Sequence, residues 1–526
     1  MKIALAQLNY TIGDIDGNTS KIIDSINKAK AQRADLVIFA EQAVSGTPAF
    51  DLLRKTTFLE LCEDALVEIA SCCDGIAAIV GLPILTREGT ISAAALIQDR
   101  KVLRYVGKKY ITARREMGFL VPSKGFEYAT IKGHKCAIVV GDDLSREHDF
   151  DKSVETVISI NARKYGRGTM TYRYEMMRHL SFVEGKNLVL VNQVGGSTDI
   201  VYDGTSGAFN NRGELVLMMK QFEEDFQIFD TKAQNPPVGV PSTYNDRTRM
   251  VYQAARCGLR DFFLKNGYKK ACIGLSGGID SAVVACLAAD ALGRQNIRAL
   301  LLPSQFSSDH SVEDAKKLAE NLGIEYNVIP ITEIYTSVVN TLKPVIGGRE
   351  FDATEENIQT RIRTVLLMAV QNKADYILLN SSNKSENALG LCTLYGDTAG
   401  AFSPTGDLYK SEMYDLARYI NRTQGDPIPG NILDKEPSSE LHPGQKDSDI
   451  LPPYEVVDAI LYRMIEEGQH REEIVNAGFD SEVVEKIHAM IMRNEKKRYQ
   501  FPPVLRLSMC SFGHERLMPL TNKYGD

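Results

Sequence analysis

The stretch "ACIGLSGGIDSAVVACLAADALG", residues 271–293, decides the fold of the second half of the chain. Its first residues are continuously apolar, as expected of a buried parallel strand, and a Ser-Gly-Gly turn leads from them into an apolar helical segment. Two glycines allow a tight turn and let the backbone approach an anion closely. The free N–H groups at the start of the helix then point at phosphate oxygens, helped by the helix dipole. The stretch therefore predicts a phosphate-binding loop in an α/β sheet.

Both halves of the chain read as α/β. In the second half, "IRALLLPS", "IEYNVIPI" and "ADYILLN" are apolar strands, which predicts a doubly wound parallel sheet. In the first half, strand patterns such as "KIALAQL", "KCAIVVG" and "NLVLVNQV" alternate with helical ones. The proline-rich "AQNPPVGVPSTYND" between them is typical of an interdomain joint. We therefore expect domains at 1–235 and 247–526, joined by a linker at 236–246.

Length and composition limit the classes of function. With 526 residues, 44% of them hydrophobic and 25% charged, the chain is long enough for two or more cores. A net charge of -7 argues against nucleic-acid binding. Nine cysteines without a CxxC pair indicate reduced thiols, and hence a cytoplasmic protein. The first residues hold no long apolar core and no apolar run reaches ~18 residues, so neither a secretory signal nor a membrane partner is expected.

Two glycines alone could form a purely structural turn between a strand and a helix. The full Ser-Gly-Gly-Ile-Asp-Ser pattern is more specific and favours a phosphate-binding loop. Asp280 beside a phosphate site makes chemical sense with Mg²⁺ between the two. No Gly-Lys-Ser/Thr follows, so the loop is not a Walker A loop. It resembles the pyrophosphate loop of the ATP pyrophosphatases, which release pyrophosphate and leave AMP on the substrate.

Later motifs narrow the resemblance. In chain order they are "FDATEENIQTRIRTVLLMAVQNK", "LNSSNKSENALGLCTLYGDTAGAFSP", "DLYKSEMYDLAR", "ILDKEPSSEL" and "NEKKRYQFPP". Together they resemble the synthetase domain of the glutamine-dependent NAD synthetase family. The resemblance implies a ligase that amidates nicotinate adenine dinucleotide (deamido-NAD) through an adenylated intermediate, releasing AMP and pyrophosphate.

The same resemblance implies site residues. Asp280 and Glu386 would bind Mg²⁺, and deamido-NAD would contact Asn357, Glu386 and Lys497. Without the resemblance, Lys410 could be a solvated helix lysine, Glu386 a helix-capping partner and Asn357 a surface residue. The residues implied for ATP are Gly274, Leu275, Ser276, Gly277, Gly278, Ile279, Asp280, Ser281, Ser381 and Lys410.

The first half resembles the nitrilase/amidase family, which implies an α-β-β-α sandwich. That family uses Glu, Lys and Cys, because thiolate attack on an amide needs a general base and a cation near the developing oxyanion. Glu41 in "LVIFAEQAVSG" stands at the base position, and Lys108 in "YVGKKYIT" at the lysine position, with Lys109 as the alternative register. In "KCAIVVGDDLS", Gly141 stands where the family has its cysteine.

The chain differs from the nitrilase/amidase family at several positions around the amidase centre. Cys136 lies five positions before Gly141 on the predicted strand, an odd offset that points it to the opposite face, and Asp142 is a poor nucleophile toward an amide. The family favours "SASP" where this chain has "NARK", residues 161–164. We expect an inactive amidase, with Glu41 and Lys108 kept as a buried ion pair or as a residual ligand site.

The leading interpretation is an NAD synthetase that uses ATP, Mg²⁺ and free ammonia and forms a homo-oligomer. Four alternatives stay open at this point. Glutamine could be used through an unrecognised nucleophile or a partner glutaminase. The chain could be a carbon–nitrogen hydrolase with an accessory nucleotide domain, a non-catalytic nucleotide sensor, or another amide ligase that acts on a nucleobase.

Overall fold

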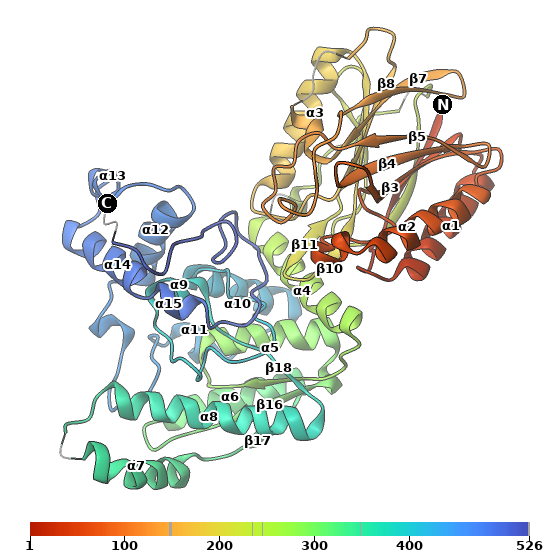
Figure 1. The fold of residues 1–526 in the computed structure, drawn as a ribbon. Coiled ribbons are helices and arrows are strands. Elements are labelled where there is room, and N and C mark those ends of the chain that lie inside the picture. Colours follow the sequence, from red (N-terminus) through yellow and green to blue (C-terminus); the bar gives the residue numbers. More distant parts are fainter. Residues whose placement is uncertain (147–149, 234, 245, 348, 524–526) are drawn as a thin grey trace. The chain divides into compact units, whose positions relative to one another are not determined.

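The computed structural model describes residues 1–146, 150–233, 235–244, 246–347 and 349–523 (Figure 1). The chain divides into two compact units, Met1–Asn245 and Asp246–Asp526, and each is described by itself. Among the described residues of the predicted linker, the only regular element is a short 3₁₀ turn at Ser242–Tyr244.

The first unit contains two six-stranded sheets. The first sheet has the order β14 (Asp225–Asp230), β1 (Lys2–Gln7), β2 (Leu36–Ile38), β3 (Ala77–Leu85), β4 (Thr90–Gln98) and β5 (Lys101–Gly107). The second has the order β13 (Leu215–Met218), β12 (Gly207–Phe209), β9 (Asn187–Asn192), β8 (Thr156–Asn161), β7 (His134–Val140) and β6 (Glu127–Ile131). A small hairpin joins β10 (Val194–Ser197) to β11 (Ile200–Asp203).

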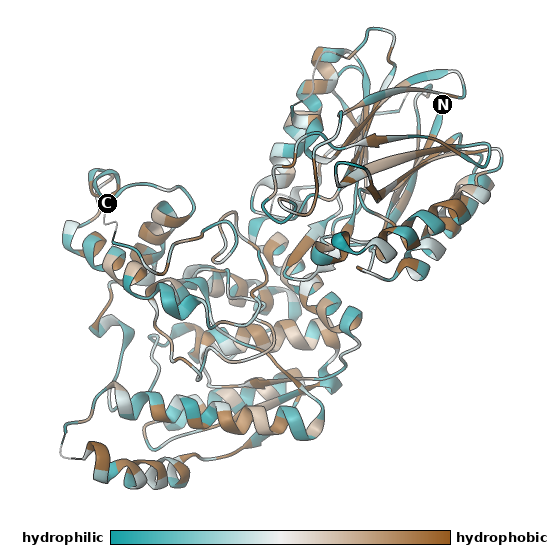
Figure 2. Ribbon diagram, in the orientation of Figure 1, coloured by the Kyte–Doolittle hydropathy of each residue, from teal (hydrophilic) through white to brown (hydrophobic). Residues whose placement is uncertain are grey.

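The two sheets pack face to face. The side chains of strand β7 alternate between two hydrophobic clusters, as expected for a strand that is covered on both faces. Ile138 and Val140 belong to the large cluster between the sheets, which also contains residues of β1, whereas Val139 belongs to a second cluster on the other face. That second cluster includes Met177 of α3 (Thr169–Glu184), which covers the outer face of the second sheet. Helices α1 (Ile15–Ala31) and α2 (Thr56–Ser71) cover the first sheet, and the strands appear mostly brown in Figure 2. This arrangement is the predicted α-β-β-α sandwich.

The second unit is built on a four-stranded parallel sheet. Its order is β17 (Glu325–Val328), β16 (Ile297–Leu301), β15 (Ala271–Gly274) and β18 (Ile377–Leu378). Helices α5 (Ile279–Leu292) and α6 (Asp309–Leu322) connect successive strands on one face, and α8 (Ala353–Ala374) packs against β15 and β18 on the other (Figure 1). The predicted doubly wound fold is confirmed.

The remaining helices surround this sheet and the C-terminal region. Helix α4 (Arg247–Asn266) packs against α5, and α7 (Thr332–Ile346) packs against α8. The others are α9 (Lys384–Leu389), α10 (Lys410–Gln424), α11 (Gly430–Asp434), α12 (Tyr454–Ile465), α13 (Arg471–Asn476), α14 (Ser481–Arg493) and α15 (Glu495–Arg498).

The strand order creates a switch point beside β15. From β15 the chain proceeds to β16 and β17 in one direction, and then returns to form β18 on the other side of β15. In open α/β sheets, ligands bind outside the carboxyl ends of the strands at such a point. The loop that follows β15 is the predicted phosphate loop, so the fold places it where a nucleotide is expected.

Candidate active site

A cavity of ≈ 660 Å³ opens at the carboxyl ends of β15, β16 and β18. It is lined by ten of the predicted residues: Gly274, Leu275, Ser276, Gly278, Ile279, Asp280, Ser281, Ser381, Glu386 and Lys410. Gly277, Asn357 and Lys497 are not among the lining residues. The cavity therefore collects nearly all of the residues expected at ATP.

The phosphate loop has the backbone that its glycines suggest. Gly277 has a φ of +80°, and a Cβ atom there would lie 2.2 Å from the carbonyl oxygen of Ser311, so a side chain does not fit. Helix α5 begins at Ile279, and no side chain caps its first turn at Gly278. The Ser276 hydroxyl instead accepts a hydrogen bond from the Gly278 N–H (3.2 Å). An uncapped helix start facing a cavity is suited to hold phosphate oxygens.

A charged cluster stands at the start of this helix. The Lys410 Nζ atom lies 2.5 Å from Asp280 Oδ2 and 3.2 Å from Glu386 Oε1, so one ammonium contacts both carboxylates. Only 4% of Lys410 is exposed, so the alternative of a solvated helix lysine is wrong. Burial raises the pKa of Glu386 to about 7, and Lys410 offsets this only in part. Burial acts to lower the pKa of Lys410, but the two carboxylates outweigh it and raise that pKa.

These carboxylates fit a magnesium ion that arrives with ATP. Within the described ranges, no three His, Cys, Asp or Glu side chains form a group that could hold a metal by themselves. Mg²⁺, however, usually takes one or two protein carboxylates and completes its octahedron with substrate phosphates and water. Asp280 and Glu386 supply that number of carboxylates beside the phosphate loop.

The cavity lining also holds two charged residues, Arg363 and Glu440, to which the sequence motifs gave no role. Arg363 of α8 donates from Nε to the carbonyl oxygen of Leu302 (2.9 Å), and burial lowers the pKa of this guanidinium to about 10. Glu440 accepts hydrogen bonds from the hydroxyls of Ser308 and Ser311, both at 2.7 Å. Both residues line the cavity and belong to the quoted motifs, so the charged positions of those motifs were the available signal.

Asn357 and Lys497 lie just behind the cavity wall. The Lys497 ammonium donates to the carbonyl oxygens of Gly390 (2.6 Å) and Cys392 (2.8 Å). The Asn357 Oδ1 atom accepts a hydrogen bond from the Thr393 hydroxyl (2.6 Å). Both side chains thus hold the segment 390–393, of which Cys392 lines the cavity. Their assignment to deamido-NAD stays a prediction.

A second ionic site lies in the first unit. Lys108 Nζ is 3.2 Å from Glu41 Oε1 and 2.9 Å from Glu116 Oε2, and all three side chains are buried. Ser92 donates to Glu41 Oε1 as well (2.8 Å). Lys108 rather than Lys109 therefore reaches Glu41. Glu116 was not predicted, because only the folded chain brings it to Lys108.

Electrostatics favours a retained ion pair in this site. Burial raises the pKa of Glu41, and Lys108 opposes that shift. Burial acts to lower the pKa of Lys108, but Glu41 and Glu116 outweigh it and raise that pKa above the usual value. The lysine therefore stays cationic between two carboxylates.

Gly141 faces this cluster directly. It follows β7 with a φ of +60°, and a Cβ atom on it would lie 2.8 Å from Glu41 Oε2 and 2.9 Å from Lys108 Nζ. A side chain at this position would thus contact both the Glu41 carboxylate and the Lys108 ammonium. Cys136 cannot replace it, because its side chain belongs to the core between the sheets and burial raises its thiol pKa to about 12.

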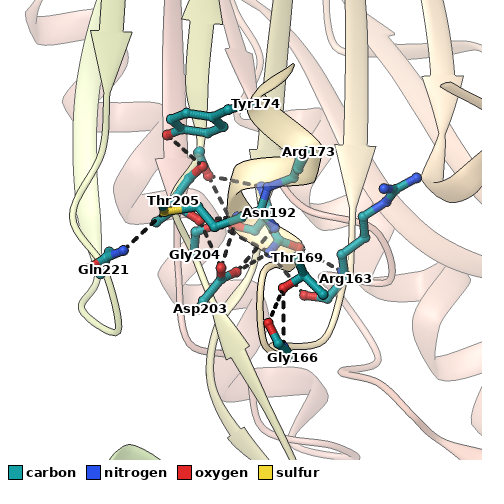
Figure 3. A network of polar contacts seen from close by, with 12 residues as sticks. Arg163, Gly166, Thr169, Arg173, Tyr174, Asn192, Asp203, Gly204, Thr205 and Gln221 are labelled. Carbon is teal, nitrogen blue, oxygen red and sulfur yellow. Dashed lines mark hydrogen bonds and ion pairs between the residues drawn. The ribbon is translucent and has the colours of Figure 1, made fainter. Parts of the chain in front are cut away.

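The neighbouring "NARK" segment is held by a buried polar network. Arg163 forms an ion pair with Asp142 (3.1 Å), and its backbone N–H donates to Asn192 Oδ1 (2.8 Å). Asn192 in turn donates to Asp203, which pairs with the buried Arg173 at 3.0 Å (Figure 3). Asp142 is therefore occupied by a structural ion pair next to Gly141.

The fold and the two sites define a class of protein: a nitrilase-like unit followed by a unit of the ATP-pyrophosphatase type. A family model described as "NAD synthase" matches residues 251–501. The chain is 37% identical over 535 residues to a glutamine-dependent NAD(+) synthetase of Acinetobacter baylyi, covering 99% of this chain and 98% of the relative. It is 36% identical to the protein of that name from Aquifex aeolicus, covering 100% of both.

Solved structures agree with this likeness. The glutamine-dependent NAD+ synthetase of Acinetobacter baumannii in complex with ADP is 34% identical, with a TM-score of 0.76 over 99% of this chain and 98% of that one. A glutamine-dependent NAD(+) synthetase from Cytophaga hutchinsonii, at 19% identity and a TM-score of 0.87 over 99% and 98% of the two chains, shares the fold. The chain belongs to the NAD synthetase family, whose members are ligases that form a carbon–nitrogen bond. Among the described residues, no helix is both long enough and apolar enough to span a bilayer.

Proposed function

We propose that this NAD synthetase amidates deamido-NAD with free ammonia and ATP, and that its first unit does not hydrolyse glutamine. One observation supports the choice of nitrogen donor. Gly141 places no reactive atom between Glu41 and Lys108, although its backbone faces both side chains. Hydrolysis of an amide by a Glu-Lys-Cys site proceeds through a covalent thioester, which glycine cannot form.

The ATP chemistry follows from the substrate. A nicotinate carboxylate does not expel hydroxide when ammonia attacks, so it must first be activated. One carboxylate oxygen attacks the α-phosphorus of ATP, pyrophosphate leaves, and AMP remains on the carboxyl group. Ammonia then adds to the carbonyl carbon and loses a proton, and AMP leaves as the amide forms.

The cavity residues are suited to these steps. The N–H groups at the start of α5 would hold phosphate oxygens, and Ser276, Ser281 and Ser381 would add hydroxyl donors. Lys410 would neutralise charge on the leaving pyrophosphate. Asp280 and Glu386 would hold Mg²⁺, which when bound screens the phosphate charge and polarises the reacting bond. Glu386, which lines the cavity, is proposed to contact deamido-NAD directly, and Asn357 and Lys497 are proposed to contact it at the segment 390–393 that they hold.

The first unit is then a scaffold. We assign residues 1–235 to a catalytically degenerate nitrilase-like domain and 247–526 to the synthetase domain. The buried cluster of Glu41, Lys108 and Glu116 would stabilise its sandwich rather than react. The assembled enzyme is proposed to be a cytoplasmic homo-oligomer that binds small-molecule substrates.

One assay tests the nitrogen donor. Purified protein is given ATP, Mg²⁺ and deamido-NAD with either ammonium or glutamine, and NAD⁺, AMP and glutamate are measured. Ammonium should support NAD⁺ synthesis with one AMP per NAD⁺, and glutamine should support little or none. NAD⁺ formed from glutamine with an equal amount of glutamate would overturn the proposal.

A second candidate is glutamine dependence, because the relatives from Acinetobacter baylyi and Aquifex aeolicus are named for it. It would need an unrecognised nucleophile in this chain or a separate glutaminase. The same assay separates the two. Glutamate release by the pure protein, coupled to NAD⁺ formation, indicates a nucleophile in the chain. NAD⁺ formation from ammonium without glutamate release from glutamine supports free ammonia as the donor.

A further inference from the structure

We propose that Asn383 is a positioning residue that holds Asp280 and Glu386 in register for the metal. This inference rests on the proposed function, since it concerns the magnesium site. Asn383 lies in the "NKSE" segment between β18 and α9 and is fully buried. Its side chain touches the elements that carry both carboxylates, although it was not assigned a role from the sequence.

Each end of the Asn383 amide has a different partner. Its Oδ1 atom accepts a hydrogen bond from the Glu386 backbone N–H (2.9 Å) and so caps helix α9. Its Nδ2 atom donates to Asp280 Oδ1 (3.0 Å). The partners decide the orientation of the amide, because an N–H needs an acceptor and a carboxylate needs a donor.

Position 383 must supply both an acceptor for the Glu386 N–H and a donor for Asp280, and few residue types can do so. Serine or threonine could cap the helix, but their side chains are too short to donate to Asp280 as well. Aspartate would cap the helix and place a second negative charge against Asp280. Asparagine combines an acceptor and a donor at the required length.

The contact completes the environment of Asp280. Lys410 donates to Asp280 Oδ2 (2.5 Å) and Asn383 donates to Asp280 Oδ1, so each oxygen receives one hydrogen bond and keeps a lone pair for a metal. Glu386 is tied to the same cluster through Lys410 and through the helix that Asn383 caps. A single amide thus links the helix that follows the phosphate loop to the helix that carries the second carboxylate.

The neighbours of Asn383 explain why the short helix α9 can serve as a rigid support. Lys384 is fully buried and pairs with Glu466 (2.5 Å) and Asp407 (3.0 Å). Ser385 donates to Asp458 (2.5 Å). The first three residues of "NKSE" therefore anchor the segment, and Glu386 lines the cavity. Groups that orient metal ligands in this way typically contribute about 10–100-fold in metal affinity or activity.

The test measures metal binding at equilibrium, without turnover. Mn²⁺ replaces Mg²⁺, and free Mn²⁺ is followed by electron paramagnetic resonance in the presence of ATP and the absence of deamido-NAD, with the same ATP and Mn²⁺ measured without protein so that the Mn²⁺ bound by ATP alone is subtracted. Asn383→Ser keeps an N-cap hydroxyl and loses the contact with Asp280. We expect its Kd for Mn²⁺ to rise about 10–100-fold, while its circular dichroism matches that of the wild type.

A matched control is Asn421→Ser. Asn421 also donates one hydrogen bond and accepts one, both with the backbone of Ile428 at 2.8 Å, and it does not line the cavity. We expect this variant to lose thermal stability without a change in the Kd for Mn²⁺. An equal loss of Mn²⁺ affinity in both variants would show a general structural effect and overturn the inference.

The remaining outcomes are also decisive. A folded Asn383→Ser variant that binds Mn²⁺ like the wild type overturns the inference. If that variant does not fold, Asn383→Asp keeps the volume and the cap acceptor. A rise in its Kd for Mn²⁺ of about tenfold or more supports the inference, whereas an unchanged or lowered Kd overturns it. Failure of the wild type to bind Mn²⁺ with ATP would instead contradict the proposed metal site itself.

Discussion

Gly141 faces Glu41 so closely that a Cβ atom on the glycine would lie 2.8 Å from Glu41 Oε2. The same atom would lie 2.9 Å from Lys108 Nζ. The first unit therefore holds a carboxylate and an ammonium beside a position that has no side chain. In the second unit, by contrast, Asp280, Glu386 and Lys410 meet at the cavity with their charged ends in contact.

Replacing Gly141 with cysteine should not restore use of glutamine. A non-glycine residue at a φ of +60° costs roughly 1–2 kcal/mol, and its Cβ atom would displace the ends of Glu41 and Lys108. We expect Gly141→Cys and Gly141→Ala to lower the melting temperature alike and to release no glutamate. Glutamate release by the cysteine variant alone, coupled to NAD⁺ formation, would show that the rest of the glutaminase site is still competent.

Lys108→Met should destabilise the first unit without affecting the chemistry of the second. The change leaves two buried carboxylates without their cation, and breaking a buried pair typically costs about 3–5 kcal/mol. Thermal denaturation should show the loss, and ammonium-dependent turnover of the folded protein should match that of the wild type. Lys101→Met, at an exposed lysine, is the control. A loss of turnover at unchanged stability would contradict a purely structural role.

The buried thiol of Cys136 should resist alkylation near neutral pH. Burial raises its pKa to about 12, so about one thiol in ten thousand is ionised at pH 8, and the thiolate is the reactive form. Reactivity of the folded protein should therefore stay low at neutral pH and increase with pH over the range in which the protein remains folded. Mass spectrometry after iodoacetamide treatment measures this. Rapid labelling of Cys136 at pH 7 would contradict this prediction and would make Cys136 a candidate for the missing nucleophile.

Asp280→Ala should abolish formation of AMP and pyrophosphate while the fold persists. The variant loses a proposed metal ligand and one of the two carboxylates that contact Lys410, which should remove several kcal/mol of transition-state stabilisation. Turnover and circular dichroism are measured together. Asp309→Ala, at an exposed position in the first turn of α6, is the control. Near-normal turnover of Asp280→Ala would remove Asp280 from the mechanism.

Lys497→Ala should weaken use of deamido-NAD more than use of ATP. The side chain holds the carbonyl groups of Gly390 and Cys392 beside the cavity, so its loss should loosen that wall. Steady-state kinetics with each substrate varied should show a raised KM for deamido-NAD and little change for ATP. The exposed Lys496→Ala serves as the matched control. An effect confined to the KM for ATP would contradict the assignment.

Much of the synthetase cavity could be predicted from the sequence because its chemistry is local. Gly277, Gly278 and Asp280 lie within one turn, so their spacing alone indicates a loop with free N–H groups and a carboxylate beside it. The continuously apolar strands indicated a buried parallel sheet in the same way. Asn357 and Lys497 were identified by their motifs, but motif order could not tell that both side chains hold the segment 390–393.

The sequence by itself determined the fold class, the phosphate loop and the absence of a side chain at Gly141, because these depend on residue type and on short spacing. Only the tertiary structure decided which partners meet across long separations. Lys108 rather than Lys109 reaches Glu41, 67 residues away, and Asn383 reaches Asp280, 103 residues away. Such contacts leave no periodic pattern in the chain, since they are set by strand order and by the packing of helices on the sheet.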